Sequence, residues 1–222
     1  MQDLTDSGFI TLLNKLSKQV ESDSFDLDLY ANILLAYNCM PTLLHIKPAN
    51  LLQVNKQKYI YANELIHIID NYARMHGCAC FLIHENELLV SLLIYNRQIL
   101  DEILTDKEIE QYLTACGYSM TPNRLENSLA RLKESYGEYF NYKYKSDLPD
   151  GSRKFPHEIG LLLGYPLKDV DGFIKNRGLN YLLCGYWKVY HDKDRAKKIF
   201  EEYDRARAYA INLLINGCRL RE

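Results

Sequence analysis

The segment of residues 155–190 holds the densest set of side chains that could bind a ligand. It reads FPHEIGLLLGYPLKDVDGFIKNRGLNYLLCGYWKVY. A helix that begins near His157 would place His157, Gly160 and Gly164 on one face, because residues three, four and seven apart share a helical face. Glycines there let a ligand or a second backbone come close. The amides at such a helix start, with the two cations just before it, favour an anion. Close packing of two elements is the alternative use of this face.

The end of the same segment has the alternation of a β-strand over residues 181–190. Side chains in a strand point to opposite faces in turn, so one face would be core-like and the other polar and aromatic. The polar and aromatic face consists of Cys184, Tyr186, Lys188 and Tyr190. We expect His157 and this strand to face one cleft, and a solvated sheet surface is the alternative. The ligand-binding residues predicted from the whole segment are His157, Gly160, Gly164, Tyr165, Cys184, Tyr186, Lys188 and Tyr190.

Cys39 is a candidate nucleophile, and His157 or His45 would have to act as its base. A thiol near a helix N-terminus or a protonated histidine has a lowered pKa and reacts as the thiolate. A helix is expected just before Cys39, and Met40-Pro41-Thr42 follows it. An inert thiol is the alternative, because no spacing in the sequence places a base beside Cys39.

The cysteines and histidines do not follow a metal-site motif. His157-Glu158 would need a second histidine four residues on, and position 161 is leucine, so a zincin helix is excluded. Cys78-Ala-Cys80 places two thiols on one strand face without a nearby second pair, which favours reduced core thiols. No metal ligands are predicted. A haem- or metal-handling protein that uses His157, Cys184 and tyrosines stays open as a third hypothesis.

Composition excludes several classes of protein. The formal net charge is −2, so a general nucleic-acid binder is not expected, because phosphate contacts need a basic surface. There is no run of about 18 apolar residues and the N-terminus is acidic and polar, so no membrane partner and a cytoplasmic location are expected. Phosphate-binding loops and the G-x-S-x-G motif are missing from the sequence.

Size and tyrosine content give two broader expectations. A chain of 222 residues with 47% hydrophobic residues can form one globular domain over residues 1–222, with an N-terminal helical extension at 1–24. The chain has 18 tyrosines, and tyrosine suits half-buried surfaces because it joins an apolar ring to a polar tip. This content points to binding of a ligand or a protein partner, or to a homo-oligomer.

Hydrophobic periodicity predicts a mixed α and β fold, in which a small sheet of roughly four strands is flanked by many helices and the topology is undetermined. Two apolar runs over residues 78–95 flank a polar turn and predict a hairpin. A third strand is expected at 50–54 and a fourth at 181–190. The predicted helices cover residues 8–20, 26–38, 61–76, 97–104, 106–116, 121–136, 157–163, 167–176 and 193–215. Residues 137–154 are expected to form a loop.

Three blocks of the sequence resemble the DUF3793 family, uncharacterised proteins mostly of Clostridia and related anaerobes. These blocks are CMPTLLHIKPANLL at 39–52, residues 89–100, and the long segment 155–190. The resemblance covers about residues 25–205. The chain departs from the family pattern at Met40, at Leu44-His45 and at Leu162.

The resemblance implies a bacterial, cytoplasmic, single-domain protein, and it carries over no catalytic residue, ligand or cofactor. Genes of similar proteins lie near flavodoxin-type or iron-related genes, which points toward redox or iron physiology. Three functions therefore stay open, with the enzyme question undecided and leaning against catalysis. They are a ligand- or partner-binding or regulatory protein, an enzyme that uses Cys39 and His157, and a haem or metal handler.

Overall fold

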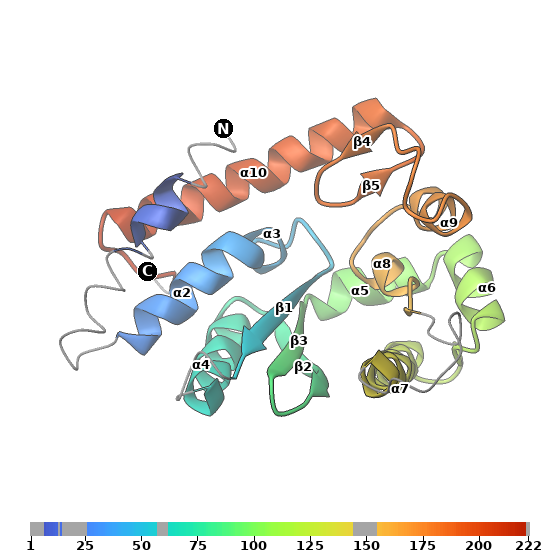
Figure 1. Cartoon of the computed structure of the whole chain (residues 1–222), viewed down its shortest axis with the longest axis horizontal. Helices are drawn as coiled ribbons and strands as arrows, with labels where there is room; N and C mark the ends of the chain where they lie inside the picture. The colour runs from blue at the N-terminus through green and yellow to red at the C-terminus, as the bar shows by residue number, and fades with distance from the viewer. Residues whose placement is uncertain (1–6, 13, 15–25, 57–61, 144–154, 221–222) are drawn as a thin grey trace.

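A three-stranded antiparallel sheet lies at the centre of the fold (Figure 1). The structure is a computed structural model, and it describes residues 7–12, 14, 26–56, 62–143 and 155–220. The architecture is mixed α and β, as predicted. The expected sheet of four strands is instead this three-stranded sheet and a separate two-stranded ribbon.

The sheet has the order β1-β3-β2, and its strands are β1 (Ala49–Asn55), β2 (Ala79–Glu85) and β3 (Leu89–Tyr95). The predicted hairpin at 78–95 and the predicted strand at 50–54 are confirmed. Every residue of β3 after the first is buried. This explains why that stretch of sequence is almost continuously apolar, because a central strand covered on both faces has no solvent side.

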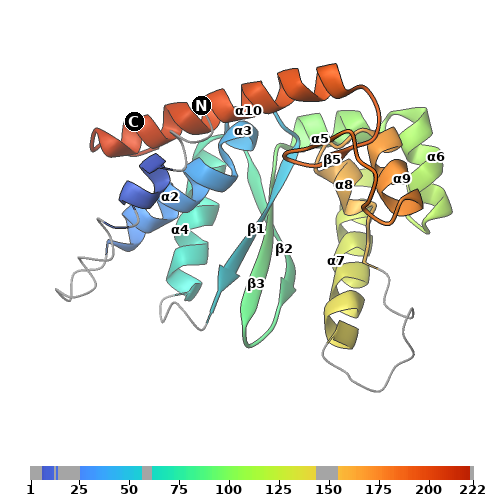
Figure 2. The ribbon, with the colours of Figure 1, turned by 45° about the horizontal axis from the view of Figure 1, so that its top comes forward.

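Alternation along β3 sends its side chains into two different hydrophobic layers. Val90, Leu92 and Ile94 belong to a layer with helices α2 (Leu27–Asn38) and α4 (Ala62–Met75). Leu93 and Tyr95 belong to a layer with α5 (Arg97–Leu104), α6 (Lys107–Ala115), α7 (Arg124–Lys143) and α8 (Ile159–Leu162). Figure 2 shows α4 and α7 on opposite sides of the strands. The prediction that helices cover both faces is therefore confirmed.

The helices of the first layer are α2 (Leu27–Asn38), α3 (Met40–Leu43), α4 (Ala62–Met75) and α10 (Lys193–Ile215). Those of the second layer are α5 (Arg97–Leu104), α6 (Lys107–Ala115) and α7 (Arg124–Lys143). The long helix α10 begins at its predicted cap, because the Asp192 side chain accepts from the Arg195 N–H. Figure 2 shows α10 running from the α2 side of the molecule to the ribbon.

The last elements, in chain order before α10, are α8 (Ile159–Leu162), α9 (Leu167–Lys175), β4 (Leu183–Cys184) and β5 (Lys188–Val189). Pro166 precedes α9 with an extended ψ of 136°, as suits a residue outside the helix. After α9, the Gly178 N–H donates to the Phe173 carbonyl with Gly178 in the left-handed region, which ends the helix. The chain then turns back into the ribbon.

Several of the predicted elements differ from the structure. The strand over 181–190 is wrong, because the chain turns at Gly185–Trp187 and the two short strands pair with each other. The helix at 157–163 is shorter and covers only α8. The short helix α3 replaces the expected break at Pro41, which occupies its first turn. The predicted helix over 8–20 falls largely outside the described residues, although residues 7–12 are helical.

The helix that was expected to end near residue 136 continues as α7 to Lys143. Gly137 therefore does not end it, and residues 137–143 of the predicted loop are helical, whereas residues 144–154 lie outside the described part. Pro122 is not its first residue, since Asn123 in the left-handed region stands between Pro122 and the helix. These differences change the boundaries of elements but not the fold class.

Candidate functional site

A cavity of about 180 Å³ lies where α8, α9 and the ribbon meet. We call it the pocket. Its lining comes from the segment that the sequence singles out, and the lining residues are Phe155, His157, Ile159, Gly160, Tyr165, Asp169, Val170, Phe173, Trp187 and Lys188. His157 and Lys188 thus face one cavity, as predicted.

Asp169 fastens α9 to the ribbon and so builds one wall of the pocket. Its carboxylate is buried and accepts three hydrogen bonds. One oxygen accepts from the Trp187 indole N–H at 2.7 Å, and the other accepts from the backbone N–H groups of Tyr190 and His191 at 2.8 Å each. Because both oxygens accept from the ribbon, Asp169 holds the wall in place.

Close approach of α9 to the ribbon depends on Gly172. A Cβ added at Gly172 would lie 2.6 Å from two atoms of Tyr190, so a larger residue would force the two elements apart. Tyr190 therefore packs against the back of α9 and is not part of the pocket lining. This close contact and the Asp169 bonds together fix the ribbon relative to the helix.

The walls of the pocket are mainly aromatic. The Tyr165 and Trp187 rings stack with centroids 5.1 Å apart. The His157 ring lies between two others, 5.4 Å from the Phe155 centroid and 5.2 Å from that of Phe173. Flat rings arranged in this way suit a flat apolar group, because aromatic pairs gain from stacked and edge contacts beyond simple burial.

Two titratable side chains, His157 and Lys188, stand in this apolar wall. Burial lowers the pKa of His157, and the neighbouring Glu158 opposes that shift. The imidazole is therefore neutral at pH 7 and has one N–H to donate. The Lys188 ammonium donates to the Gly178 carbonyl at 2.7 Å and lies 5.8 Å from the Phe173 ring centroid. An ammonium has three donors, so Lys188 is the cationic group of the pocket.

The structure divides the predicted ligand-binding residues between two places. His157, Gly160, Tyr165 and Lys188 line the pocket. Cys184 and Tyr186 instead line a more open groove of about 480 Å³ between the ribbon and α10. The turn of the ribbon is the reason, because it reverses the chain between Tyr186 and Lys188.

In that groove the Tyr186 hydroxyl donates to Asp204 Oδ1 at 2.9 Å and accepts from Arg207 at 3.3 Å. Three polar residues of the groove, Tyr186, Asp204 and Arg207, are thus bonded to one another. Tyr186 acts there as a link between the ribbon and α10.

Gly164 does not share a helical face with His157 and Gly160, because α8 ends before it. Gly164 is in the left-handed region with φ of 80°, and an added Cβ would lie 2.6 Å from Pro48. Gly160 is different, since an added Cβ there would lie 3.0 Å from Val170 and 3.1 Å from Tyr165, two lining residues. Gly164 therefore serves packing, and Gly160 shapes the pocket.

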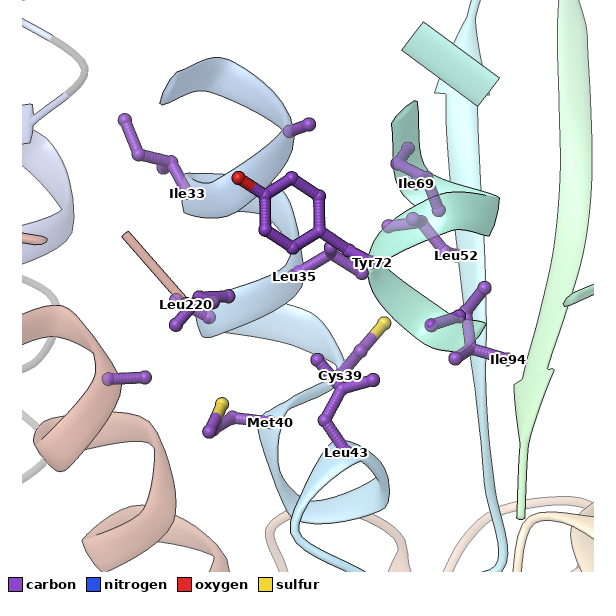
Figure 3. Close-up of a cluster of buried hydrophobic side chains, with 14 of the residues drawn as sticks. Ile33, Leu35, Cys39, Met40, Leu43, Leu52, Ile69, Tyr72, Ile94 and Leu220 are labelled. Atoms are coloured by element: carbon purple, nitrogen blue, oxygen red, sulfur yellow. The ribbon is translucent and has the colours of Figure 1, made fainter. Parts of the chain in front are cut away.

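Cys39 is buried in the first hydrophobic layer, away from solvent (Figure 3). Figure 3 shows it among Met40, Leu43 and Tyr72. Burial raises the pKa of the thiol to about 12, although the nearby Lys47 cation opposes the rise. A thiol in this state is a poor nucleophile, because the thiolate is the reactive form.

Neither predicted base acts on Cys39. His157 lines the pocket, and the exposed His45 has its Nε2 2.7 Å from the His76 carbonyl oxygen. The hypothesis of a Cys39 nucleophile with His157 as its base therefore gains no support from this geometry, since the thiol is buried with a raised pKa and the imidazole lines the pocket. The inert-thiol alternative agrees with this geometry.

Lys47, which the sequence suggests is a solvated loop residue, is one of the most deeply buried polar side chains, with 2% exposure. Its ammonium lies 5.6 Å from the Tyr165 ring centroid and 5.8 Å from that of Tyr203. Burial lowers its pKa to about 8, and Cys39 acts in the opposite direction. Lys47 does not line the pocket, but it lies behind Tyr165.

Asp169 and Lys47 are the two residues of this region that the sequence did not identify. Asp169 stands in the first turn of a helix, where an acidic residue is usual and needs no partner. Lys47 lies in a short loop between Ile46 and Pro48, where a lysine is ordinarily exposed. No signal in the sequence distinguishes either of them.

Within the described residues, no group of three or more histidine, cysteine, aspartate or glutamate side chains could hold a metal ion. His157 and Cys184 also line different cavities. The haem- or metal-handling hypothesis therefore gains no support from side-chain geometry, and the link to redox or iron physiology stays a prediction.

A search of the described helices for a long apolar span able to cross a bilayer finds none. A profile described as "Protein of unknown function (DUF3793)" matches residues 35–222. No curated protein and no solved structure matches the chain.

Proposed function

The chain belongs to the DUF3793 family of proteins of unknown function, and we propose that it is a binding protein whose pocket takes a small aromatic group that bears a carboxylate. The observation that carries this proposal is the pocket itself. Tyr165, Phe173 and Trp187 form apolar walls, and Lys188 supplies one cation beside them. Ligand sites in proteins are typically apolar hollows with a few placed polar groups.

The size of the pocket favours a single ring. Its volume is about 180 Å³, whereas sites for drug-sized ligands begin at about 300 Å³. An engineered apolar cavity of about 150 Å³ holds benzene. A group with one six-membered ring and a short side arm therefore fits, and a nucleotide does not.

The donors of the pocket suit an anion. Asp169 is the carboxylate in the lining, and its oxygens accept three hydrogen bonds from donors of the ribbon and of His191 just after it. Lys188 keeps donors beyond the one it gives to Gly178, and the neutral His157 ring adds one more. A carboxylate that accepts from Lys188 would make a charge-assisted hydrogen bond, which is stronger than a neutral one.

The single tryptophan of the chain makes the proposal easy to test, because Trp187 is part of the wall. We expect phenylacetate to change the Trp187 emission in a saturable way when tryptophan is excited selectively. Phenylacetamide, its uncharged isostere, should bind about tenfold more weakly, because a charged hydrogen bond contributes about 1.5–3 kcal/mol.

Two matched variants sharpen this experiment. Lys188→Gln keeps a donor of similar reach but removes the charge, so it should erase the preference for phenylacetate over phenylacetamide. Lys168→Gln is the control, since Lys168 lies exposed on α9 outside the lining. A Trp187 emission that ignores both probes, or an equal response in the Lys188 and Lys168 variants, would overturn the proposal.

A further inference from the structure

We propose that the segment of residues 174–182, which we call the loop and which includes the last two residues of α9, extends the pocket into a docking surface for an acidic segment of another protein, whose apolar side chain enters the pocket. This inference rests on the proposed function, because the same pocket would hold the anchoring group. It adds the class of partner, which the pocket alone does not give.

The loop exposes large apolar side chains that nothing in the described structure covers. Leu179 is 64% exposed, Leu182 53%, Tyr181 45% and Ile174 40%. Single exposed apolar residues are common on protein surfaces, whereas a contiguous set marks an interaction site. Four such residues lie here within nine positions of the chain.

The loop is held in one conformation by its own backbone. Arg177, Gly178 and Asn180 are all in the left-handed region, with φ of 51°, 72° and 57°. The Leu182 N–H donates to the Val189 carbonyl at 2.8 Å, which ties the end of the loop to β5. A surface that is already ordered loses little conformational entropy when a partner binds.

Lys188 joins this loop to the pocket. Its ammonium donates to the Gly178 carbonyl in the loop and lies 5.1 Å from the ring centroid of Tyr181. The same side chain lines the pocket beside Phe173. Through Lys188, the exposed ring of Tyr181 therefore lies next to the aromatic pocket, an arrangement in which a pocket for an anchor has an apolar side chain at its edge.

The charge of this surface indicates the partner. Residues 172–188 contain Lys175, Arg177 and Lys188 and no aspartate or glutamate. Lys175 pairs with Asp171 at 2.5 Å, whereas Arg177 and Lys188 form no ion pair with the other described residues. An acidic segment complements this field, whereas a second copy would bring the same cations together. A bilayer would contact the apolar tip but has no side chain to fill the pocket.

The test is a selection of random linear peptides on the full-length protein, with removal of peptides that also bind the Leu179→Ser/Leu182→Ser double variant. We expect the retained peptides to place an aromatic or aliphatic residue next to aspartate or glutamate. Their affinity should fall at least about tenfold in the double variant, as for central interface residues. The Met75→Ser/Tyr209→Ser control, at 61% and 56% exposed sites elsewhere, should bind them like the wild type.

Phenylacetate separates this inference from the proposed function. The double variant should still bind phenylacetate, because Leu179 and Leu182 do not line the pocket. If phenylacetate binds and no peptide depends on Leu179 and Leu182, the docking surface is overturned and the pocket stands. If peptides depend on both leucines while the wild type ignores phenylacetate, the pocket function is overturned.

Two other outcomes would reassign the surface. Sedimentation of the wild type with anionic phospholipid vesicles, lost in the double variant, would replace the protein partner with a bilayer. Concentration-dependent dimers that the double variant cannot form would replace it with a second copy. Either result overturns the proposed acidic partner.

Discussion

Two regions of the molecule carry a lysine beside a group that could do chemistry, and the fold treats them in opposite ways. Cys39 and Lys47 form the first region, which we call the core pair, and both are buried within 2% exposure. His157 and Lys188 form the second, and both line the pocket. By residue type the core pair is the more reactive, since it contains a thiol and an amine.

The difference between them is access to solvent. Burial raises the pKa of Cys39 to about 12 and lowers that of Lys47 to about 8, so each group moves toward its neutral form where no ligand reaches it. His157 and Lys188 border a hollow, and their polar atoms can meet an incoming group. A functional site therefore needs a cavity as well as suitable residues, and only the pocket has both.

The largest expected effect concerns the carboxylate that builds the pocket. Asp169→Asn should lower the free energy of unfolding by about 2–4 kcal/mol, because an amide cannot satisfy the three donors that now meet the buried carboxylate. Urea unfolding followed by circular dichroism measures this change. Asp171→Asn is the control, two residues on in α9 and exposed in its pair with Lys175, and it should change stability little. Equal effects would show that Asp169 does not hold the ribbon.

The next effect tests how closely the two regions are packed together. Gly164 joins them, because it touches Pro48, next to Lys47, and precedes Tyr165 of the pocket. Gly164→Ala should destabilise the protein by about 2–3 kcal/mol, since a Cβ meets Pro48 in a left-handed conformation that disfavours it.

Gly137→Ala is the matched control for that prediction. Gly137 lies inside α7 with open space around its Cβ position, so alanine should stabilise the helix by about 0.5–1 kcal/mol. Thermal unfolding of both variants measures this, and the midpoint should fall for Gly164→Ala and rise for Gly137→Ala. A tolerated Gly164→Ala would mean that the two regions do not pack tightly.

Replacing Lys47 should stabilise the protein, in contrast to the replacements of Asp169 and Gly164. Lys47→Met should raise the free energy of unfolding by about 1–3 kcal/mol at pH 7, because the wild type must bury a cation there. Between about pH 8 and pH 10.5 the native amine is neutral while the unfolded one is still protonated, so wild-type stability rises with pH. The advantage of the variant should therefore shrink across that window.

Unfolding of the wild type, Lys47→Met and Lys198→Met at several pH values measures this effect. Lys198 is exposed on α10, so its variant should follow the wild type at every pH. If Lys47→Met is instead less stable than the wild type at pH 7, the prediction is wrong. The amine would then stabilise the core through its aromatic neighbours.

The smallest effect is the pH dependence caused by two histidines, the buried His84 and the half-buried His157. Burial lowers the pKa of His157 and of His84 from 6.5. The unfolded chain therefore takes up protons first, and stability is lost as the pH falls below about 6.5. His157→Gln and His84→Gln should each flatten the loss between about pH 7 and pH 5, whereas His67→Gln, at an exposed position, should not. Parallel curves for all three variants would contradict the burial of His157.

Much of the fold follows from hydrophobic periodicity, and the hairpin at 78–95 and the helix at 193–215 show why. Both have long, regular apolar patterns with a clear cap or turn at their ends, so local chemistry is enough to define them. Local chemistry does not define the ribbon, because its strands have two residues each and Gly185 is as compatible with one continuous strand as with a turn. A Cβ at Gly185 would lie 2.3 Å from Phe200 of α10, and that long-range contact is not visible in local sequence.

The candidate site was predicted in part for the same reason. His157, Gly160, Tyr165 and Lys188 come together because they are close in the chain. The role of Asp169 depends on partners from the ribbon, about 20 positions away, and the burial of Lys47 depends on α10 and on Tyr165. Neither has a local signal, because each is defined by the elements that cover it.

The most direct test compares the two regions in one sample by nuclear magnetic resonance. The Trp187 indole N–H reports on the pocket, and the methyl group of Met40, which lies beside Cys39 (Figure 3), reports on the core pair. During titration with phenylacetate, we predict a saturable shift of the indole signal and an unchanged Met40 methyl signal. A shift of the Met40 signal with a constant Trp187 signal would contradict the account, because it would place the binding site at the core pair.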